Sequence, residues 1–355
     1  MPKERMTPRE RFHAIVDHEV PDRIPLHYRA TEEATEKVMK YLGLKSYAEL
    51  RQRFHLERGM GVGGRYVGPP IPPGKSRNEA LYGIEYRTVE YEGGVYRECA
   101  SHPLADYKTV EEIEDNYTWP DPDWWDFSHI AKQVEGKEDL PLSGGGSEPF
   151  LLYKYLRGDI QAFIDLIENP DVVNYILDKL FGLCYENARR IYEQIPGRVD
   201  STSVAEDLGS QESLLYSPEQ IRTFLLPRMK MMMDLAHEAG AKVVTHSDGA
   251  IREILPDLIE AGTDILDPVQ WRCKGMDREG LKRDFGDSLV FHGAMDNQYT
   301  LPFGSVEEVR QEVADNIRLL GPTGYILAPC HNIQAVGPPE NVVAMYDTGY
   351  ELGWM

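Results

Sequence analysis

The sequence lacks any apolar run that approaches the roughly 18 consecutive residues a membrane-spanning helix requires. Its first segment, MPKERMTPRERF, also lacks the apolar core of a signal peptide. We therefore expect a soluble, cytoplasmic protein with no membrane partner.

Positive charge is scarce. The chain has 38 Lys and Arg against 59 Asp and Glu, which gives a net charge of −21. Nucleic-acid binding requires a basic surface that neutralises phosphates, so we expect no nucleic-acid partner.

The dinucleotide-binding motif GxGxxG is missing too, because the glycines at 144–146 do not have its spacing.

Cysteines are few, and their spacing does not suggest disulfides. Cys99, Cys184, Cys273 and Cys330 lie far apart and are predicted to be cytosolic thiols. Each remains a candidate core residue, metal ligand or nucleophile. With 355 residues, of which 41% are hydrophobic, the chain has enough apolar material for one large core. We predict a single domain over 1–355.

The most informative stretch runs from Ala241 to Gln270. It reads as a buried strand, a polar turn with His246, Ser247, Asp248 and Gly249, an amphipathic helix, and a second apolar strand. In parallel α/β folds the chemistry lies on turns that follow strands, so this turn is the first place to look for a site. In the alternative interpretation, Asp248 only caps the following helix.

Short apolar strands alternate with helices along the rest of the chain. This rhythm predicts an α/β fold, a single (β/α)8 TIM barrel, with an N-terminal helix over 4–18 capped by Thr7 and a β-hairpin insertion around 80–102. An eighth strand is expected near 54–62. The other predicted strands are 24–28, 140–146, 199–209, 242–249, 264–270, 288–296 and 325–332.

A barrel would bring the residues at its strand ends to one mouth. The polar residues expected there are His27, Tyr28, Ser143, Glu148, Glu206, Asp207, His246, Asp248, Asp267, Gln270, His292, Asp296, Cys330, His331 and Asn332. Among them, His246, Asp248 and Cys330 form an H-x-D…C set with Glu206 as the expected fourth donor. Zinc accepts imidazole, carboxylate and thiolate together and keeps an open position in catalytic sites. In the alternative interpretation Cys330 only fills the core.

Three blocks of the sequence resemble the uroporphyrinogen decarboxylase-like superfamily. They are MTPRERFHAIVDHEVPDRIPLHY, EDLGSQESLLYSPEQIRTFLLPRMKMMMDLAHEAGAKVVTHSDG, and the segment from FHGAMDNQYTLPFG to YDTGYELG. The resemblance covers nearly the whole chain. It implies a TIM barrel with either metal-free porphyrinogen decarboxylation or zinc-dependent methyl transfer involving a corrinoid protein.

The methyltransferase branch is the more similar one. Porphyrin decarboxylases carry an Arg-Gln-Ala-Gly-Arg block after the first strand, whereas this chain has PLHYRA with only Arg29. The branch's zinc motif is H-x-C followed by a distant Cys, and the chain matches it at His246 and Cys330 but has Asp248 at the middle position. A carboxylate ligand makes zinc more Lewis-acidic, which favours activation of an ether oxygen.

The resemblance therefore implies an O-demethylase methyltransferase. It would move methyl from an O-methyl donor, a methoxylated aromatic compound, to the cob(I)alamin of a corrinoid protein. We expect His331, Asn332, His292 or Tyr28 to assist the leaving phenol, and Trp271, Tyr299 and Glu148 to contact the substrate. The alternatives are methyl transfer from methylcorrinoid to a thiol or folate, a metal-free decarboxylase, and a non-enzymatic tetrapyrrole-binding module. The sequence leaves open whether the protein forms a homodimer.

Overall fold

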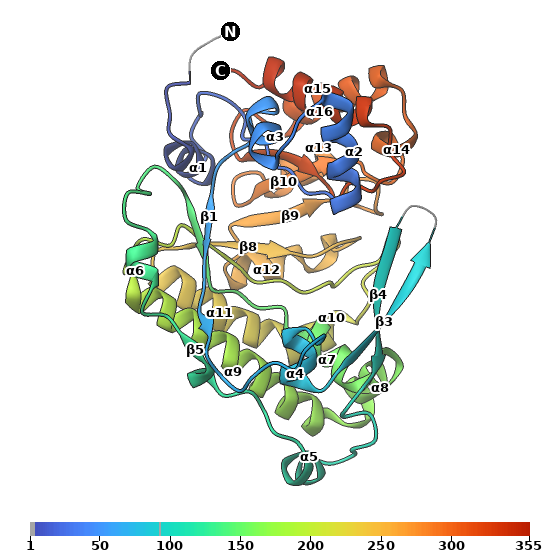
Figure 1. Cartoon of the computed structure of the whole chain (residues 1–355). Helices are drawn as coiled ribbons and strands as arrows, with labels where there is room; N and C mark the ends of the chain where they lie inside the picture. The colour runs from blue at the N-terminus through green and yellow to red at the C-terminus, as the bar shows by residue number, and fades with distance from the viewer. Residues whose placement is uncertain (1–3, 92–93) are drawn as a thin grey trace.

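The centre of the molecule is a curled parallel sheet (Figure 1). The computed structural model describes residues 4–91 and 94–355. Each strand of the sheet pairs in parallel with the next one along the chain, so their C-terminal ends meet at one edge. In spatial order the seven strands are β1 (Met60–Val62), β6 (Leu142–Gly144), β7 (Ser201–Ser203), β8 (Lys242–His246), β9 (Ile265–Val269), β10 (Val290–Met295) and β11 (Tyr325–Pro329).

These strands confirm the predicted α/β class and the predicted strand positions, including one within 54–62. The strand predicted over 24–28 is not formed as a continuous strand. Only isolated bridges form in this region, from Leu26 to Leu327 and from Ala30 to Ile333. Pro25 has no N–H to donate, which prevents a continuous ladder. On its other side the carbonyl of Leu26 accepts from the backbone N–H of Glu57 at 2.9 Å. The segment thus hydrogen-bonds both to β11 and to the residues before β1.

Helix α1 (Pro8–Val16) begins after Thr7, whose hydroxyl accepts from the N–H of Glu10, as the sequence predicts. Its apolar side chains Phe12, Ile15 and Val16 form a small separate core with Val244, Ile265, Val290 and Ile326 of the sheet. Apolar burial of this kind stabilises by about 25 cal/mol per Å2. Helix α1 therefore fills one part of the space enclosed by the sheet.

The other helices connect the strands, and several pack against the sheet from outside (Figure 1). The sequence pattern over 31–57 is helical, and the structure has two helices there, because Gly43 ends the first with a left-handed φ of 68°. The helices are α2 (Glu32–Leu42), α3 (Tyr47–Arg53), α4 (Arg77–Tyr82), α5 (Val110–Asn116), α6 (Ile130–Gln133), α7 (Pro149–Arg157), α8 (Asp159–Glu168), α9 (Pro170–Gln194), α10 (Pro218–Gln220), α11 (Leu226–Glu238), α12 (Leu255–Ala261), α13 (Arg278–Phe285), α14 (Thr300–Phe303), α15 (Val306–Leu320) and α16 (Pro339–Leu352). In the part of the chain that the structure describes, no helix is both long and apolar enough to cross a membrane.

The predicted hairpin is present as the antiparallel pair β3 (Glu85–Tyr91) and β4 (Gly94–Ser101). Glu92 and Gly93 of its predicted turn lie outside the described residues. The hairpin base packs on α7, where Tyr86 meets Tyr155 edge to face with ring centroids 6.0 Å apart. A separate two-stranded pair joins β2 (Arg65–Tyr66) to β5 (Trp125–Asp126).

Candidate functional site

Two loops at the C-terminal ends of β7 and β8 approach each other closely. A Cβ on Gly249 would lie 2.4 Å from the backbone of Gly209, and Gly249 has a left-handed φ of 92°. Glycine is therefore required here for two reasons, the close approach and the backbone angle. The N–H of Ala250 also donates to the carbonyl of Ser210 at 2.7 Å. This contact places Asp207, after β7, beside Asp248, after β8.

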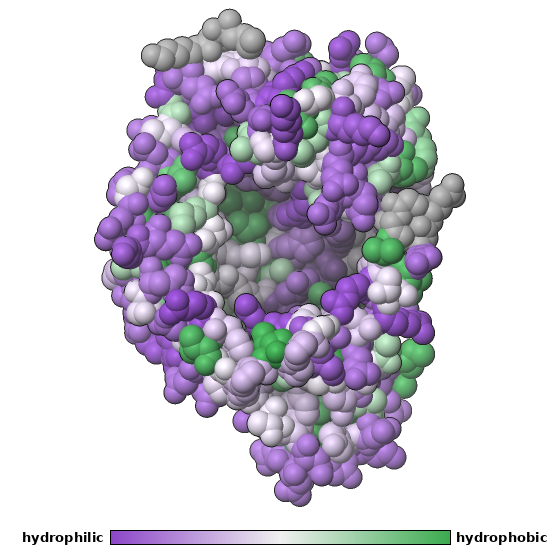
Figure 2. Space-filling model, viewed as in Figure 1, coloured by the Kyte–Doolittle hydropathy of each residue, from purple (hydrophilic) through white to green (hydrophobic). Residues whose placement is uncertain are grey.

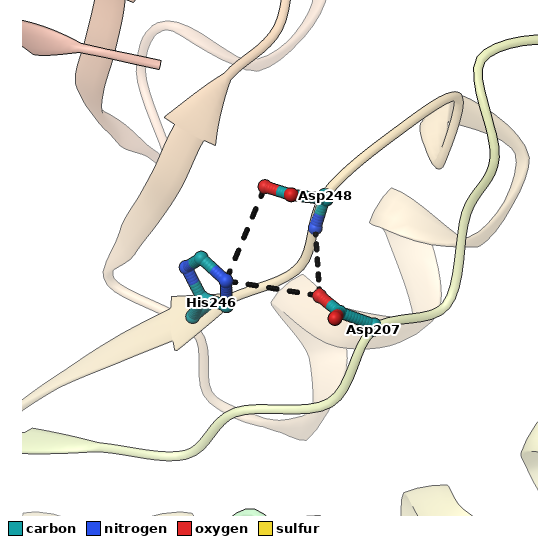
Figure 3. Close-up of side chains that lie close together, drawn as sticks. All are labelled: Asp207, His246 and Asp248. Carbon is teal, nitrogen blue, oxygen red and sulfur yellow. Dashed lines mark hydrogen bonds and ion pairs between the residues drawn. The ribbon is translucent and has the colours of Figure 1, made fainter. Parts of the chain in front are cut away.

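Asp207, His246 and Asp248 form a compact group (Figure 3). Nε2 of His246 lies 3.7 Å from Oδ1 of Asp207 and 4.0 Å from Oδ1 of Asp248. The backbone N–H of Asp248 donates to Oδ1 of Asp207 at 3.3 Å. Among the described residues, this is the one group of His, Cys, Asp and Glu whose ligand atoms all lie within 4.8 Å of one another. We call it the DHD cluster.

The carboxylate of Asp267 contacts Nδ1 of His246, the ring nitrogen on the side away from the DHD cluster. Asp267, in the middle of β9, has Oδ2 3.3 Å from Nδ1 of His246 and 2.7 Å from a guanidinium nitrogen of Arg29. With Nδ1–H donated to this carboxylate, Nε2 of His246 carries the lone pair that faces the two aspartates. A carboxylate on the far nitrogen is the usual arrangement for a histidine that binds a metal ion.

The DHD cluster fits a cation. Oδ1 of Asp248 is buried without a hydrogen-bond partner, and two carboxylates and an imidazole nitrogen converge on one point. Nitrogen and oxygen donors of this kind suit zinc and other borderline divalent metals. The alternative that Asp248 caps the next helix is wrong, because the helical turn at Arg252–Ile254 has Ile251 at its start and no side-chain cap.

The pKa values at the DHD cluster follow its charges. Burial lowers the pKa of His246, but the hydrogen bond that it donates to Asp267 and the charges of Asp267, Asp248 and Asp207 outweigh burial, and the pKa is raised. Burial raises the pKa of Asp248, partly offset by His246. Burial also opposes ionisation of Asp267, yet His292 and His246 hold its pKa well below the usual range. Asp267 is thus a fixed negative charge between two histidines.

A chain of hydrogen bonds continues from Asp267 into a cavity. Oδ1 of Asp267 lies 2.7 Å from Nδ1 of His292, and Nε2 of His292 lies 3.0 Å from Nδ1 of His27. Burial, and then the neighbouring His292, lower the pKa of His27 to about 3. His27 is therefore neutral at physiological pH.

The cavity has a volume of about 470 Å3, within the range of small-molecule sites. The space-filling view shows the hollow on this face of the molecule (Figure 2). His27, His292, Tyr28 and Arg29 line it on the side of the DHD cluster, and Arg51, Arg58, Tyr47, Phe12 and Met60 lie among its other walls.

The structure brings His246 and Asp248 together as predicted, but it does not bring Cys330 or Glu206 to them. The thiol of Cys330 donates to the carbonyl of Val269 at 3.1 Å, and burial raises its pKa well above the usual range. Both carboxylate oxygens of Glu206 accept from the N–H of Phe150, at 3.0 and 3.2 Å. The backbone N–H of Glu206 donates to the carbonyl of His246 at 3.0 Å, but neither side chain joins the DHD cluster, so their roles as ligands stay predictions.

The predicted leaving-group residues lie at different places. His292 lines the cavity, and Tyr28 does too, although its hydroxyl donates to Thr35 at 3.1 Å. His331 follows β11, and its charge offsets part of the rise in the pKa of Asp248 that burial causes. The side chain of Asn332 makes no recorded hydrogen bond, while its carbonyl accepts from Asn297.

The three predicted substrate contacts are not brought together. Burial, and then the charge of Asp207, raise the pKa of Glu148. Trp271 and Tyr299 lie in a different surface depression, where Trp271 donates to Glu312 at 3.2 Å and the guanidinium of Arg272 lies over both rings. Neither aromatic residue lines the cavity.

Two important residues were not among the predicted ligands. Asp207 directly follows Glu206, and the strand-end argument cannot tell which of two adjacent carboxylates faces the mouth. Asp267 stands in the DPV sequence of a strand that is buried along its whole length. A carboxylate in such a strand requires partners, and this was the available signal.

Comparison with known proteins places the chain in context. The uroporphyrinogen decarboxylase (URO-D) family matches residues 81–352. A protein named uroporphyrinogen decarboxylase from Nostoc punctiforme is 25% identical over 216 residues, which are 60% of this chain and 54% of that protein. One of the same name from Carboxydothermus hydrogenoformans is 25% identical over 231 residues, 63% of this chain and 61% of that one. The chain thus spans about half the length of the curated relatives it matches.

One solved structure shares the architecture along the full chain. It is described as a methyltransferase from Methanosarcina mazei and superposes with a TM-score of 0.66 at 19% identity, covering 98% of this chain and 99% of that one. At this identity the likeness establishes the fold.

Proposed function

The chain belongs to the uroporphyrinogen decarboxylase family, and within it we propose that the protein is a zinc-dependent methyltransferase. It would transfer methyl from an O-methyl donor, a methoxylated aromatic compound, to the cob(I)alamin of a separate corrinoid protein. The sheet then acts as a (β/α)8 barrel whose mouth is covered by that partner. The acidic surface, with a net charge of −21, favours a partner of complementary charge.

The DHD cluster is the observation that carries this proposal. Its buried and unpartnered Asp248 oxygen is costly unless a cation or proton joins it. Asp207, His246 and Asp248 would hold the ion. A bound zinc ion supplies Lewis acidity toward an ether oxygen. A porphyrin decarboxylase without metal has no need of this group.

The surroundings of Arg29 also speak against a porphyrin substrate. It is the only arginine in the block that follows the first strand, and it is paired with Asp267 at 2.7 Å. Porphyrin decarboxylases use arginines of that block for the substrate's carboxylates, and this block supplies no free arginine.

The chain's own side chains would position the methyl donor and supply a hydrogen bond to its leaving oxygen. Asp267 holds His246 in the tautomer whose Nε2 faces the aspartates. When methyl leaves, the C–O bond breaks and its electron pair stays on the phenolate, while cobalt(I) supplies the pair for the new C–Co bond. His292, on the cavity wall and held by Asp267 at 2.7 Å, would donate a hydrogen bond to the leaving oxygen when both its ring nitrogens carry a proton and that oxygen takes the place of Nδ1 of His27 at Nε2.

Metal analysis tests the first half of the proposal. We expect one zinc per chain in the wild type, and loss of zinc in His246→Ala and Asp248→Asn. Asp234→Asn, which alters a surface pair with Lys230, is the matched control and keeps its zinc. A wild-type protein that binds no divalent metal would sink the proposal.

Spectroscopy tests the second half. The protein is mixed with cob(I)alamin and a panel of methoxybenzenes, and we expect the methylcobalamin spectrum with at least one of them. If metal binds but no aryl ether reacts, transfer from methylcobalamin to a thiol or folate becomes the favoured direction, and demethylated product from those mixtures would establish it.

A metal-free decarboxylase is the second candidate, because the matching relatives carry that name. It predicts full activity after chelation of metals and release of CO2 from a carboxylated ring. Those two results together would favour it over methyl transfer.

A further inference from the structure

The wall of the cavity formed by β1, β6 and β7 is made of small side chains. Gly61 pairs in register with Ser143, and Ser143 with Ser201. All three line the cavity, as does Ala328 of β11. Barrels of this type usually fill their interior with layers of bulky branched side chains. Here the interior is open beside these strands.

A small apolar core lies next to this opening. Val244, Ile265, Val290 and Ile326 pack there against α1, and Ile326 and Phe12 of this core also line the cavity. The residues that line the cavity run from the His27–His292 pair past Gly61 to Arg58, just before β1. A ligand that contacts both His292 and Arg58 must span this length.

The charge of this cavity is opposite to that of the whole protein. Two of its charged residues are compensated: Arg29 pairs with Asp267, and Glu57 pairs with Arg11 at 3.0 Å and Arg23 at 2.7 Å. Arg51 and Arg58 have no carboxylate within 4.0 Å anywhere in 4–91 or 94–355. Arg51 donates only to the backbone carbonyl of Glu57, at 3.2 Å. Two uncompensated positive charges thus face the cavity.

We propose that the cavity binds a methoxylated aromatic acid, whose carboxylate is received by Arg51 and Arg58 and whose ring lies along Gly61 and Ser143. This inference rests on the proposed function and names the class of its methyl donor. Tyr28, Tyr47, Phe12 and Met60 supply the apolar surface that a ring requires. Guanidinium groups match a carboxylate with paired hydrogen bonds. The carboxylate fixes one end of the ligand, so that its other end points toward His292 and the DHD cluster.

The test measures binding, without corrinoid and without turnover. Matched ligand pairs differ only in charge: 3,4-dimethoxybenzoate and its amide, 4-methoxyphenylacetate and its amide, and 4-methoxycinnamate and its amide. Isothermal titration calorimetry gives Kd for each. We expect at least one acid to bind about tenfold or more tightly than its amide, the size of one charge-assisted hydrogen bond.

Variants then assign the effect to the two arginines. Arg58→Gln, at an exposed position, is expected to weaken the acid about tenfold and leave the amide unchanged. Arg51→Gln should act in the same direction. Arg87→Gln, on the hairpin and paired with Glu98, is the control for net charge and changes neither ligand.

Equal binding of acid and amide across all three pairs overturns the inference, as does an Arg58→Gln effect that is the same for both members of a pair. Neither result touches the proposed function, which neutral methoxybenzenes test separately. Conversely, selective acid binding by a protein that binds no metal would retain the anion site and reject the methyltransferase.

Discussion

The carboxylate of Asp267 joins His246 to His292, with Oδ2 3.3 Å from Nδ1 of His246 and Oδ1 2.7 Å from Nδ1 of His292. Both imidazoles therefore donate Nδ1–H to one buried carboxylate, and both present Nε2 outward. One Nε2 faces the aspartates of the DHD cluster and the other faces His27. A single strand residue thereby fixes two rings that belong to different parts of the site.

Removing the charge of Asp267 is expected to weaken metal binding. In Asp267→Asn the amide can still contact both rings but no longer favours the Nδ1–H tautomer of His246. Loss of such a partner typically costs 10- to 100-fold in metal affinity, so we expect about that loss in a zinc competition titration. Nitrogen-15 shifts of the imidazoles in the metal-free protein give an independent readout. Unchanged tautomers in Asp267→Asn would contradict the assignment.

We expect the carboxylate of Asp248 to lower the free energy of unfolding of the metal-free protein. Its Oδ1 is buried without a partner, and Asp207 lies beside it. We expect metal-free Asp248→Asn to be about 1 kcal/mol more stable than the wild type near neutral pH, because one of two close carboxylates is removed. Chemical denaturation with a chelator present measures this. A destabilised variant would indicate that the carboxylate has a structural partner.

His27 should make stability depend on pH. Its pKa in the folded protein is about 3, below the usual 6.5, so between these values the unfolded chain binds a proton that the folded chain does not. This contribution to stability is present above pH 6.5 and is lost as the pH falls toward 3. As the pH is lowered through about 5, the free energy of unfolding of the wild type should fall by about 1 kcal/mol per pH unit more than that of His27→Asn. Parallel curves for both proteins would argue against a neutral His27.

Arg157 and Asp165 form a buried ion pair that fixes α7 against α8. Nε of Arg157 lies 2.7 Å from Asp165, and both side chains are at most 1% exposed. Arg157→Met leaves the Asp165 carboxylate buried without its cation, which we expect to cost about 3 to 5 kcal/mol in the free energy of unfolding. Arg189→Met removes two surface ion pairs, with Glu186 and Glu193, and should cost less than about 1 kcal/mol. Similar losses in both variants would contradict this role.

Cys330 can be tested by replacing zinc with cobalt(II). Its thiol is engaged with Val269 and lies outside the DHD cluster. Because of these contacts, we expect the cobalt(II) spectrum of the wild type to lack a thiolate-to-metal charge-transfer band. The spectrum of Cys330→Ser should be the same. A charge-transfer band that disappears in Cys330→Ser would assign Cys330 as a ligand, as the sequence resemblance implies.

The sequence predicted most strands because short apolar stretches, such as those of β8, β10 and β11, end in a polar turn. Its main error in the fold was at 24–28, where Pro25 removes one donor and leaves isolated bridges. Spacing explains why His246 and Asp248 lie together, since they are two residues apart at the end of β8, and their role as metal ligands stays a prediction.

The rest of the site depends on contacts between strands that spacing does not reveal. Asp207 rather than Glu206 faces the DHD cluster because Glu206 accepts from the first free N–H of α7. Trp271 lies outside the cavity, because its indole N–H donates to Glu312 of α15. Such choices depend on which hydrogen-bond partner lies nearest in space, and a single sequence does not contain that information.

The small residues of β1, β6 and β7 have an evolutionary consequence. They set the size of the hollow from rigid strands, whereas the DHD cluster stands at the last residue of β8 and on the loops that follow β7 and β8. Changing Gly61, Ser143 or Ser201 to a larger residue would shorten the space for a ligand without touching any residue that would hold the metal. Relatives with the same chemistry could therefore diverge in donor by exchanging a few interior side chains, and the same positions are the place to redesign it.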